Sequence, residues 1–415
     1  MKTFSELLTE DKGGKNLHLE HIEDEILNYG IDGGRASINF IQSLRDMLSG
    51  GARSSINMTV KWDGAPAIFA GIDPEDSKFF VAKKSVFNVS PKLYKTNAEI
   101  DADLTGDLNE KFKVALAEFS KLGIKGVLQG DLMYTSKDLS TETIDGISYY
   151  TFQPNTIVYA VPTDSDLGKV MNKSKIGVVW HTTYTGSALQ DMKASFGVNI
   201  SKLTKTQSVW MDDASYKDVS GKATFTQTET DAITKILSQA GSTFRRINSP
   251  MLKKFLNLQD SMTGALSGAS LKTYNNSKVR AGEIIKNPKQ HSAGYVKWVE
   301  MSIQKQIDKL KSVAGKDKYT KIQKEYMREV SKHVNNLTQI LTFQNLIVDA
   351  KMQIVKKLNS VKGLTDTFIK TDNGFKVTNP EGYVAIDRVG GTAVKLVDRM
   401  EFSFNNFTAI KAWDK

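Results

Sequence analysis

A long helical segment that interrupts a region of short β-type runs constrains the fold of this chain most. From Arg53 onward, short apolar runs alternate with turn residues. Between about residues 226 and 360, apolar residues recur at intervals of three and four instead, and from Leu364 the β-type pattern returns. The predicted strands before the interruption are Asn57–Lys61, Ala67–Ala70, Lys78–Ala82, Gly126–Leu128, Ile157–Val161 and Gly177–His181.

Helical spacing is clearest in three places. One helix is predicted over Leu108–Leu122, and another carries a stripe from Ile322 to Leu341. Residues 1–52 also show helical spacing, which Gly30, Gly33 and Gly34 are expected to break. The sequence therefore predicts an α+β protein: an N-terminal helical segment (1–52), an antiparallel-sheet domain in two parts (53–224 and 363–415), and an all-helical insertion between them (225–362).

Positive charge is concentrated in the helical insertion. Phe225–Ser360 contains 23 Lys and Arg but only 10 Asp and Glu, an excess larger than the +10 of the whole chain. A local positive field favours a polyanionic partner such as nucleic acid, although a solvated lysine-rich surface has the same composition. Six cations here have aromatic neighbours, and we predict that they contact nucleic acid, although aromatic side chains that pack inward would give the same pattern: Arg245, Arg246, Lys253, Lys254, Lys278 and Arg280.

Composition excludes several other classes of protein. The chain has no cysteine, so disulfides, thiolate zinc sites and cysteine nucleophiles are excluded. It has no apolar run long enough to span a membrane, and its first residues lack the apolar core of a secretion signal. We therefore expect a cytoplasmic protein without a membrane partner.

Three short segments in the β-type regions carry the residues for nucleotide chemistry. They are Val60-Lys61-Trp62-Asp63-Gly64, Gln129-Gly130-Asp131-Leu132, and Glu381-Gly382-Tyr383-Val384 followed by Ala393-Val394-Lys395-Leu396. A lysine that attacks the α-phosphorus of a nucleotide must first lose its proton, and with a pKa near 10.4 only about one free lysine in a few thousand is neutral at pH 7. A nearby cation must lower that pKa, carboxylates must hold metal and ribose, and a second cation must balance the phosphate charge.

These segments, in this order, resemble the motifs of the covalent nucleotidyltransferases: DNA ligases, RNA ligases and mRNA capping enzymes. Lys61-Trp62-Asp63-Gly64 resembles motif I, Gly130-Asp131-Leu132 motif III, Glu381-Gly382-Tyr383-Val384 motif IV, and Val394-Lys395-Leu396 motif V. Ala82-Lys83-Lys84-Ser85 resembles the basic motif Ia, and Ile157–Val161 resembles the aromatic strand of motif IIIa. The N-terminal region also resembles proteins of large tailed bacteriophages, which implies the cytoplasm of an infected bacterium.

The resemblance implies a role for each matched residue. Lys61 would be the nucleophile that accepts AMP from ATP, and Lys395 would contact the α-phosphate. Asp131 and Glu381 would bind Mg²⁺, with Asp131 contacting the ribose as the other possibility. Tyr159 would stack on the base. The remaining nucleotide contacts would come from Asp63, Gly64, Lys83 and Lys84.

The sequence departs from the family at several positions. Pro66 stands where many members have arginine, Asp131 replaces the usual glutamate, and Ala393 replaces a second lysine. Few residues follow Lys395, too few for the oligonucleotide-binding domain of DNA ligases. The resemblance therefore implies an ATP-dependent RNA ligase. The alternatives are a DNA ligase without that domain and a degenerate ligase fold that only binds nucleic acid. His181, a lone histidine in a predicted strand, is interpreted as structural.

Overall fold

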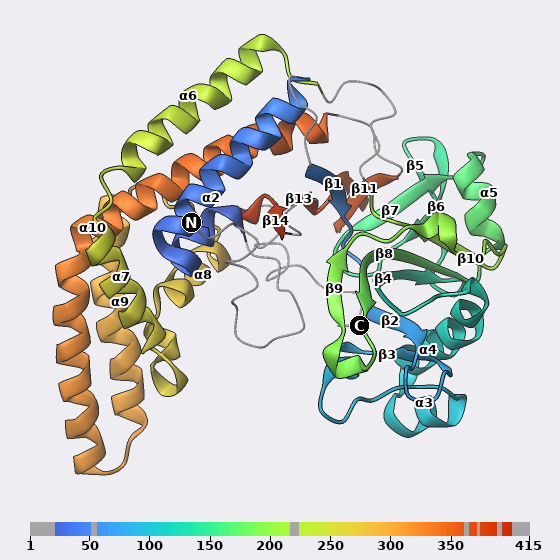
Figure 1. Cartoon of the computed structure of the whole chain (residues 1–415), viewed down its shortest axis with the longest axis horizontal. Coiled ribbons are helices and arrows are strands. Elements are labelled where there is room, and N and C mark those ends of the chain that lie inside the picture. Colours follow the sequence, from blue (N-terminus) through green and yellow to red (C-terminus); the bar gives the residue numbers. More distant parts are fainter. Residues whose placement is uncertain are drawn as a thin grey trace.

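The computed structural model describes residues 21–50, 56–215, 224–360, 365–371, 374–387 and 392–400. Within these residues the fold is α+β, with three β-sheets on one side and a group of long helices on the other (Figure 1). All pairings between the strands are antiparallel except that of β10 with β8.

The largest sheet has six strands in the order β10-β8-β4-β2-β3, with β9 added beside β8. Its strands are β2 (Ala67–Ile72), β3 (Phe79–Ala82), β4 (Val127–Thr135), β8 (Ile176–Thr185), β9 (Lys193–Phe196) and β10 (Val209–Asp212). Side chains alternate between the two faces of a strand. Leu128 and Leu132 of β4 therefore pack together beneath Phe112 and Phe119 of helix α4, while Gln129 and Asp131 face the other way.

Two smaller sheets complete the β side. The five-stranded sheet has the order β12-β11-β7-β6-β5, and the three-stranded sheet has the order β1-β13-β14. Their strands are β5 (Ser140–Ile144), β6 (Ile147–Phe152), β7 (Val158–Pro162), β11 (Asp366–Thr371), β12 (Gly374–Val377), β1 (Ile56–Lys61), β13 (Gly382–Asp387) and β14 (Thr392–Leu396). Both sheets join strands from before and after the long helices, as an interrupted β-rich domain requires.

The long helices pack on one another and on the three-stranded sheet. They are α2 (Glu25–Leu48), α6 (Gln227–Phe244), α7 (Ser249–Asp260), α8 (Leu271–Arg280), α9 (Pro288–Lys309) and α10 (Val313–Asn359); the short helices α3 (Asn97–Asp103), α4 (Gly106–Phe119) and α5 (Asp166–Lys173) belong to the β side. Thr226 and Glu229 form a reciprocal cap at the start of α6. With 47 residues, α10 is about 70 Å long and forms a hairpin with α9 (Figure 1).

The N-terminal helix differs from the prediction. Helix α2 continues through Gly33 and Gly34 and is interrupted only at Gly30, whose φ of +64° is non-helical. At position 34 glycine makes room for α6 instead of ending the helix: a Cβ there would lie 2.6 Å from Phe244. The predicted break is therefore confirmed at Gly30 and wrong at Gly33 and Gly34.

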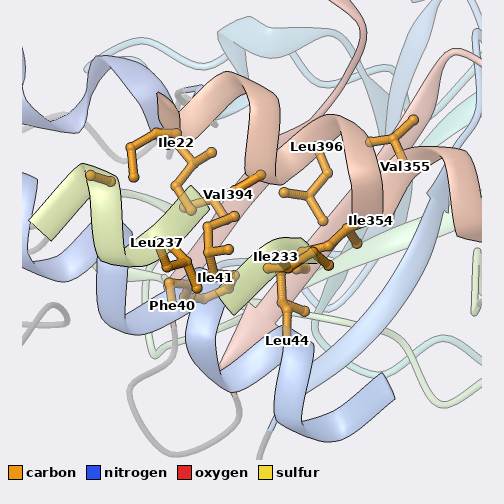
Figure 2. Close-up of a cluster of buried hydrophobic side chains, with 14 of the residues drawn as sticks. Ile22, Phe40, Ile41, Leu44, Ile233, Leu237, Ile354, Val355, Val394 and Leu396 are labelled. Carbon is orange, nitrogen blue, oxygen red and sulfur yellow. The ribbon is translucent and has the colours of Figure 1, made fainter. Parts of the chain in front are cut away.

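The core beneath the helices reaches into the three-stranded sheet. Figure 2 shows Val394 and Leu396 of β14 among side chains of α2, α6 and α10. Tyr383 and Ala385 of β13 join the same core. Because side chains alternate, Lys395 must face away from the helices. No helix within the described residues is both long and apolar enough to cross a membrane.

Candidate active site

A cavity of about 290 Å³ separates the three-stranded sheet from the six-stranded sheet. On the side of the three-stranded sheet, the cavity is bounded by the face of the sheet that points away from the helical core. Four of the predicted site residues line the cavity. Those residues are Lys61, Lys84, Asp131 and Lys395. Side chains from β1, from the start of the short helix Lys84–Phe87, from β4 and from β14 thus meet in one place.

Lys61 lies at the end of β1 and is paired with Glu381. The antiparallel register of β1 and β13 sets Lys61 opposite Gly382, which brings Glu381 alongside although 320 positions separate the two residues. Lys61 Nζ donates a hydrogen bond to Glu381 Oε2 within this ion pair. Burial disfavours the charged amine, but the Glu381 carboxylate, with smaller contributions from Asp131 and Asp63, outweighs it and raises the pKa of Lys61. Lys61 is therefore a protonated ammonium in this arrangement.

Glycines allow close approach on both sides of this pair. Gly64 lies in the loop after Lys61, where a Cβ would be 2.4 Å from the Cβ of Asp131. The loop is fixed to β4 because Ala65 N donates to Leu132 O at 3.1 Å. Gly382 has a φ of +147°, which favours glycine, and a Cβ there would lie 2.8 Å from the carbonyl oxygen of Leu396.

Asp131 is a carboxylate on the cavity wall that is poorly compensated by its surroundings. Burial raises its pKa and the charge of Asp63 adds to the rise, while His181, Lys61 and Lys84 oppose it. Its nearest ring nitrogen is Nε2 of His181, 3.8 Å from Asp131 Oδ2. His181 also lines the cavity, so a residue that the sequence presented as structural lies among the predicted site residues.

Asp63 does not line the cavity and serves the backbone instead. Its carboxylate accepts hydrogen bonds from Asn155 Nδ2 at 2.6 Å, from Thr156 N at 2.8 Å and from Ile157 N at 3.0 Å. A carboxylate with three donors is already well satisfied. Asp63 therefore fixes the turn before β7 and, through it, the loop that follows Lys61; the predicted contact with a nucleotide does not fit this position.

Tyr159 is also placed differently from its predicted role. It is buried, its hydroxyl accepts a hydrogen bond from Asp63 N at 2.6 Å, and its ring packs between Trp62 and Phe152 with centroids 5.0 and 5.4 Å away. The cavity that Tyr159 borders is a different one, of about 440 Å³. The predicted stacking on a base in the Lys61 cavity is therefore not supported; the rings that line that cavity are Trp62, His181, Tyr184 and Phe196.

The paired lysines Lys83 and Lys84 separate. Lys84 lines the cavity, whereas Lys83 Nζ is 3.2 Å from Asp103, outside it. Lys395 lines the cavity as the alternation in β14 requires, and the β13–β14 register sets it opposite Val384. Of the neighbouring lysines Lys83 and Lys84, only Lys84 lines the cavity that holds Lys61 and Lys395.

Carboxylates around Lys61 fit a magnesium ion that arrives with phosphates. Within the described ranges, no three His, Asp or Glu side chains gather into a complete metal site. Mg²⁺ usually needs only one or two carboxylates, with phosphate oxygens and water filling the other positions. Burial raises the pKa of Glu381; Lys61 opposes this rise, and the charges of Asp63 and, to a smaller extent, Asp131 add to it. Glu381 does not itself line the cavity but is paired to Lys61, which does, and a cation near these carboxylates would stabilise their charged forms.

The six basic residues predicted to bind nucleic acid fall in two places. Arg245, Arg246, Lys253 and Lys254 are exposed at the corner between α6 and α7, which a hydrogen bond from Asn248 N to Asn336 Oδ1 (3.0 Å) joins to α10. Lys278 and Arg280 lie apart from them at the end of α8, where Lys278 pairs with Glu283 at 2.7 Å.

A row of exposed basic residues on α10 extends the first group. Lys321, Lys324, Arg328 and Lys332 follow one another at helical spacing, so they share one face. Lys254 belongs to the same field: burial lowers the pKa of His333, and the charges of Lys254 and Lys332 lower it further. Glu329 pairs with Arg328 and Lys332 at 3.2 and 2.7 Å and reduces the net charge of the row.

Fold and cavity together define an α+β protein with a lysine–carboxylate site between two β-sheets. Residues 16–411 match a family of unknown function (DUF6267), so the chain belongs to that family. A search of the curated proteins found no match. A search of the solved structures found none either.

Proposed function

We propose that this protein is an ATP-dependent polynucleotide ligase of the covalent nucleotidyltransferase superfamily, with RNA as the favoured substrate. One observation carries the proposal. Lys61, Asp131 and Lys395 come from three segments spread over more than 300 positions, yet they line one cavity, with Glu381 paired to Lys61. The β1–β13 pairing by itself accounts for the contact of Lys61 with Glu381, but Asp131 and Lys395, matched by the same motif resemblance, line the same cavity as Lys61, and this supports a shared site.

In the first step, Lys61 would take AMP from ATP. The neutral amine attacks the α-phosphorus, the phosphorus–nitrogen bond forms, and pyrophosphate leaves with the electrons of the broken phosphorus–oxygen bond. The excess proton on Nζ passes to water. Lys395 and Lys84 would balance the negative charge on the phosphates, because each lines the cavity that holds Lys61.

The ion pair between Lys61 and Glu381 would keep the amine inactive until the nucleotide binds. In that pair Lys61 holds its proton, and the pKa shift has the wrong sign for a nucleophile. Mg²⁺ bound by Glu381 and Asp131 would supply positive charge that neutralises the phosphates. If Glu381 held the cation, it would stabilise the ammonium of Lys61 less, and Lys61 would lose its proton more easily.

Later steps need a polynucleotide with a 5′-phosphate and a 3′-hydroxyl. An oxygen of the 5′-phosphate displaces Lys61 from the AMP phosphorus, and the 3′-hydroxyl then attacks the 5′-phosphorus and releases AMP. The exposed cations on α7 and α10 would hold the strands through phosphate contacts. Affinity should then fall steeply with salt concentration.

A second candidate is a degenerate ligase fold that binds nucleic acid without transferring a nucleotide. The observation that favours it is the same ion pair, because an ammonium held by a buried carboxylate can be purely structural. The two candidates predict opposite results when the protein meets labelled nucleotide.

Incubation with α-labelled ATP and Mg²⁺, followed by denaturing electrophoresis, tests the proposal. We expect label on the wild type and none on Lys61→Ala. Lys83→Ala is the matched control, because this lysine pairs with Asp103 outside the cavity and should leave labelling intact. Label from GTP alone would indicate capping-type chemistry, and no label from either nucleotide would favour the degenerate fold. Sealing of nicked RNA compared with nicked DNA then separates RNA ligase from DNA ligase.

A further inference from the structure

An extra residue in β8 places His181 in the candidate site. Opposite β4, Thr182 pairs with Gln129 and Trp180 pairs with Gly130, so the pairing skips His181 and forms a β-bulge there. Trp180 packs into the core beneath α4, whereas His181 and Thr182 both line the Lys61 cavity. Bulges are common beside active sites, where they redirect a side chain.

The imidazole is held on one side and directed at a carboxylate on the other. His181 Nδ1 is 2.8 Å from the hydroxyl of Thr182, and Nε2 is 3.8 Å from Asp131 Oδ2. The bulge itself is fixed because the His181 carbonyl accepts a hydrogen bond from Gly197 N at 2.7 Å. If the hydroxyl of Thr182 donates to Nδ1, the ring hydrogen is on Nε2 and points toward Asp131.

We propose that His181 is a positioning residue that orients the Asp131 carboxylate toward a nucleoside triphosphate in the cavity. The proposal rests on the function proposed above. Asp131 extends from the central strand β4 beside Gly64, and a carboxylate that must meet a ribose or a metal needs a fixed rotamer. At 3.8 Å from Asp131 Oδ2, Nε2 is beyond hydrogen-bond distance in this structure, so the ring would form that bond as the nucleotide binds and would leave the other oxygen for the ligand. Partners of metal-binding or substrate-binding groups act in this way and typically change affinity by about 10–100-fold.

Binding of Mg–ATP, measured by calorimetry in a Lys61→Ala background, tests the role without any contribution from turnover. His181→Ala should weaken binding about tenfold. His181→Gln should restore most of the affinity, because its amide nitrogen extends as far as Nε2. His181→Asn should not, because its amide nitrogen corresponds to Nδ1. Titration with adenosine and no metal shows whether Asp131 contacts the ribose or Mg²⁺. If His181→Ala binds both adenosine and Mg–ATP more weakly than the parent, Asp131 contacts the ribose. If it binds only Mg–ATP more weakly, Asp131 contacts the metal.

Thr183→Val is the matched control, because this neighbour in β8 donates to Gly197 O at 3.0 Å and does not line the cavity. Thermal melting of each variant identifies any that fails to fold, and the comparison of Gln with Asn remains informative because both are polar. Equal affinity for the parent, Ala, Asn and Gln variants overturns this inference and leaves the proposed function standing. Absence of ATP binding to the wild type overturns both.

Discussion

Replacing Lys351 with methionine should destabilise the helical core by several kcal/mol. Lys351 of α10 is 1% exposed and Glu23 is 3% exposed, and Nζ lies 2.9 and 3.0 Å from the two carboxylate oxygens. This pair joins the segment before α2 to the last three turns of α10. Methionine keeps the length of the side chain but removes the charge, so the carboxylate would remain buried without its main partner.

The magnitude follows from the pKa of Glu23. Burial acts to raise that pKa, but the charge and hydrogen bonds of Lys351, helped by His21 and Arg399, lower it from 4.5 to about 2. A difference of this size corresponds to roughly 3 kcal/mol of stability. Because the pKa is lowered in the folded state, this contribution is fully present above pH 4.5 and is lost as the pH falls toward 2. Removing one partner of a buried ion pair typically costs about 3–5 kcal/mol of stability, which agrees with the value obtained from the pKa of Glu23.

Urea denaturation followed by helical circular dichroism at pH 7 measures the effect. We expect Lys351→Met to lose about 3 kcal/mol and Glu23→Gln combined with Lys351→Met to recover part of it, because burying a neutral amide costs less than burying a carboxylate. Lys332→Met is the control: its pair with Glu329 is on the surface and should contribute less than about 1 kcal/mol. A loss below about 1 kcal/mol for Lys351→Met, or no recovery in the double variant, would refute the reasoning.

Three further results follow from the site. Glu381→Gln should lower the pKa of Lys61, which competitive labelling with an amine reagent over a pH series would measure; an unchanged labelling curve contradicts the assigned ion pair. Gly64→Ala should destabilise the protein by about 1–3 kcal/mol in thermal melting, because the added carbon would lie 2.4 Å from a β4 side chain. Replacing Arg245 and Arg246 with glutamine should weaken the salt dependence of nucleic-acid binding. The slope of log affinity against log salt concentration should fall by about one unit for each phosphate that is no longer neutralised. An unchanged slope would show that these two arginines do not contact the phosphates.

Local pattern was enough to predict much of the secondary structure. The runs around Lys61, Ala67 and Ile157 are confirmed as β1, β2 and β7, and the helix expected over Leu108–Leu122 is α4, Gly106–Phe119. Strands β5 and β6 were not predicted. They are largely exposed on one face and rich in hydroxyl and aromatic side chains, so their apolar alternation is weak. A hairpin of this kind is stabilised by pairing with strands that can be distant in the sequence, so a short stretch of sequence does not reveal it.

The sequence predicts which types of residue form the site, but it does not predict which of them contact one another. The sequence supplies a lysine and two carboxylates in separate segments, and only strand pairing brings Lys61 and Glu381 together. Asp63 has the expected identity, but its oxygens are used by the backbone at residues 156 and 157. His181 was assigned a structural role because a bulge leaves no mark in the pattern of apolar residues.

The three-stranded sheet explains why the helices and the site form one unit. In β14, Val394 and Leu396 pack into the core shared with α2, α6 and α10, and Lys395 between them faces the cavity. In β13, Tyr383 faces that core and Val384 faces the cavity. Every second residue of these strands is thus held by helical packing, and the residues between them form the cavity wall. The position of Lys395 therefore depends on the packing of helices far from it in sequence, and the segment that interrupts the β-rich region is part of what builds the site.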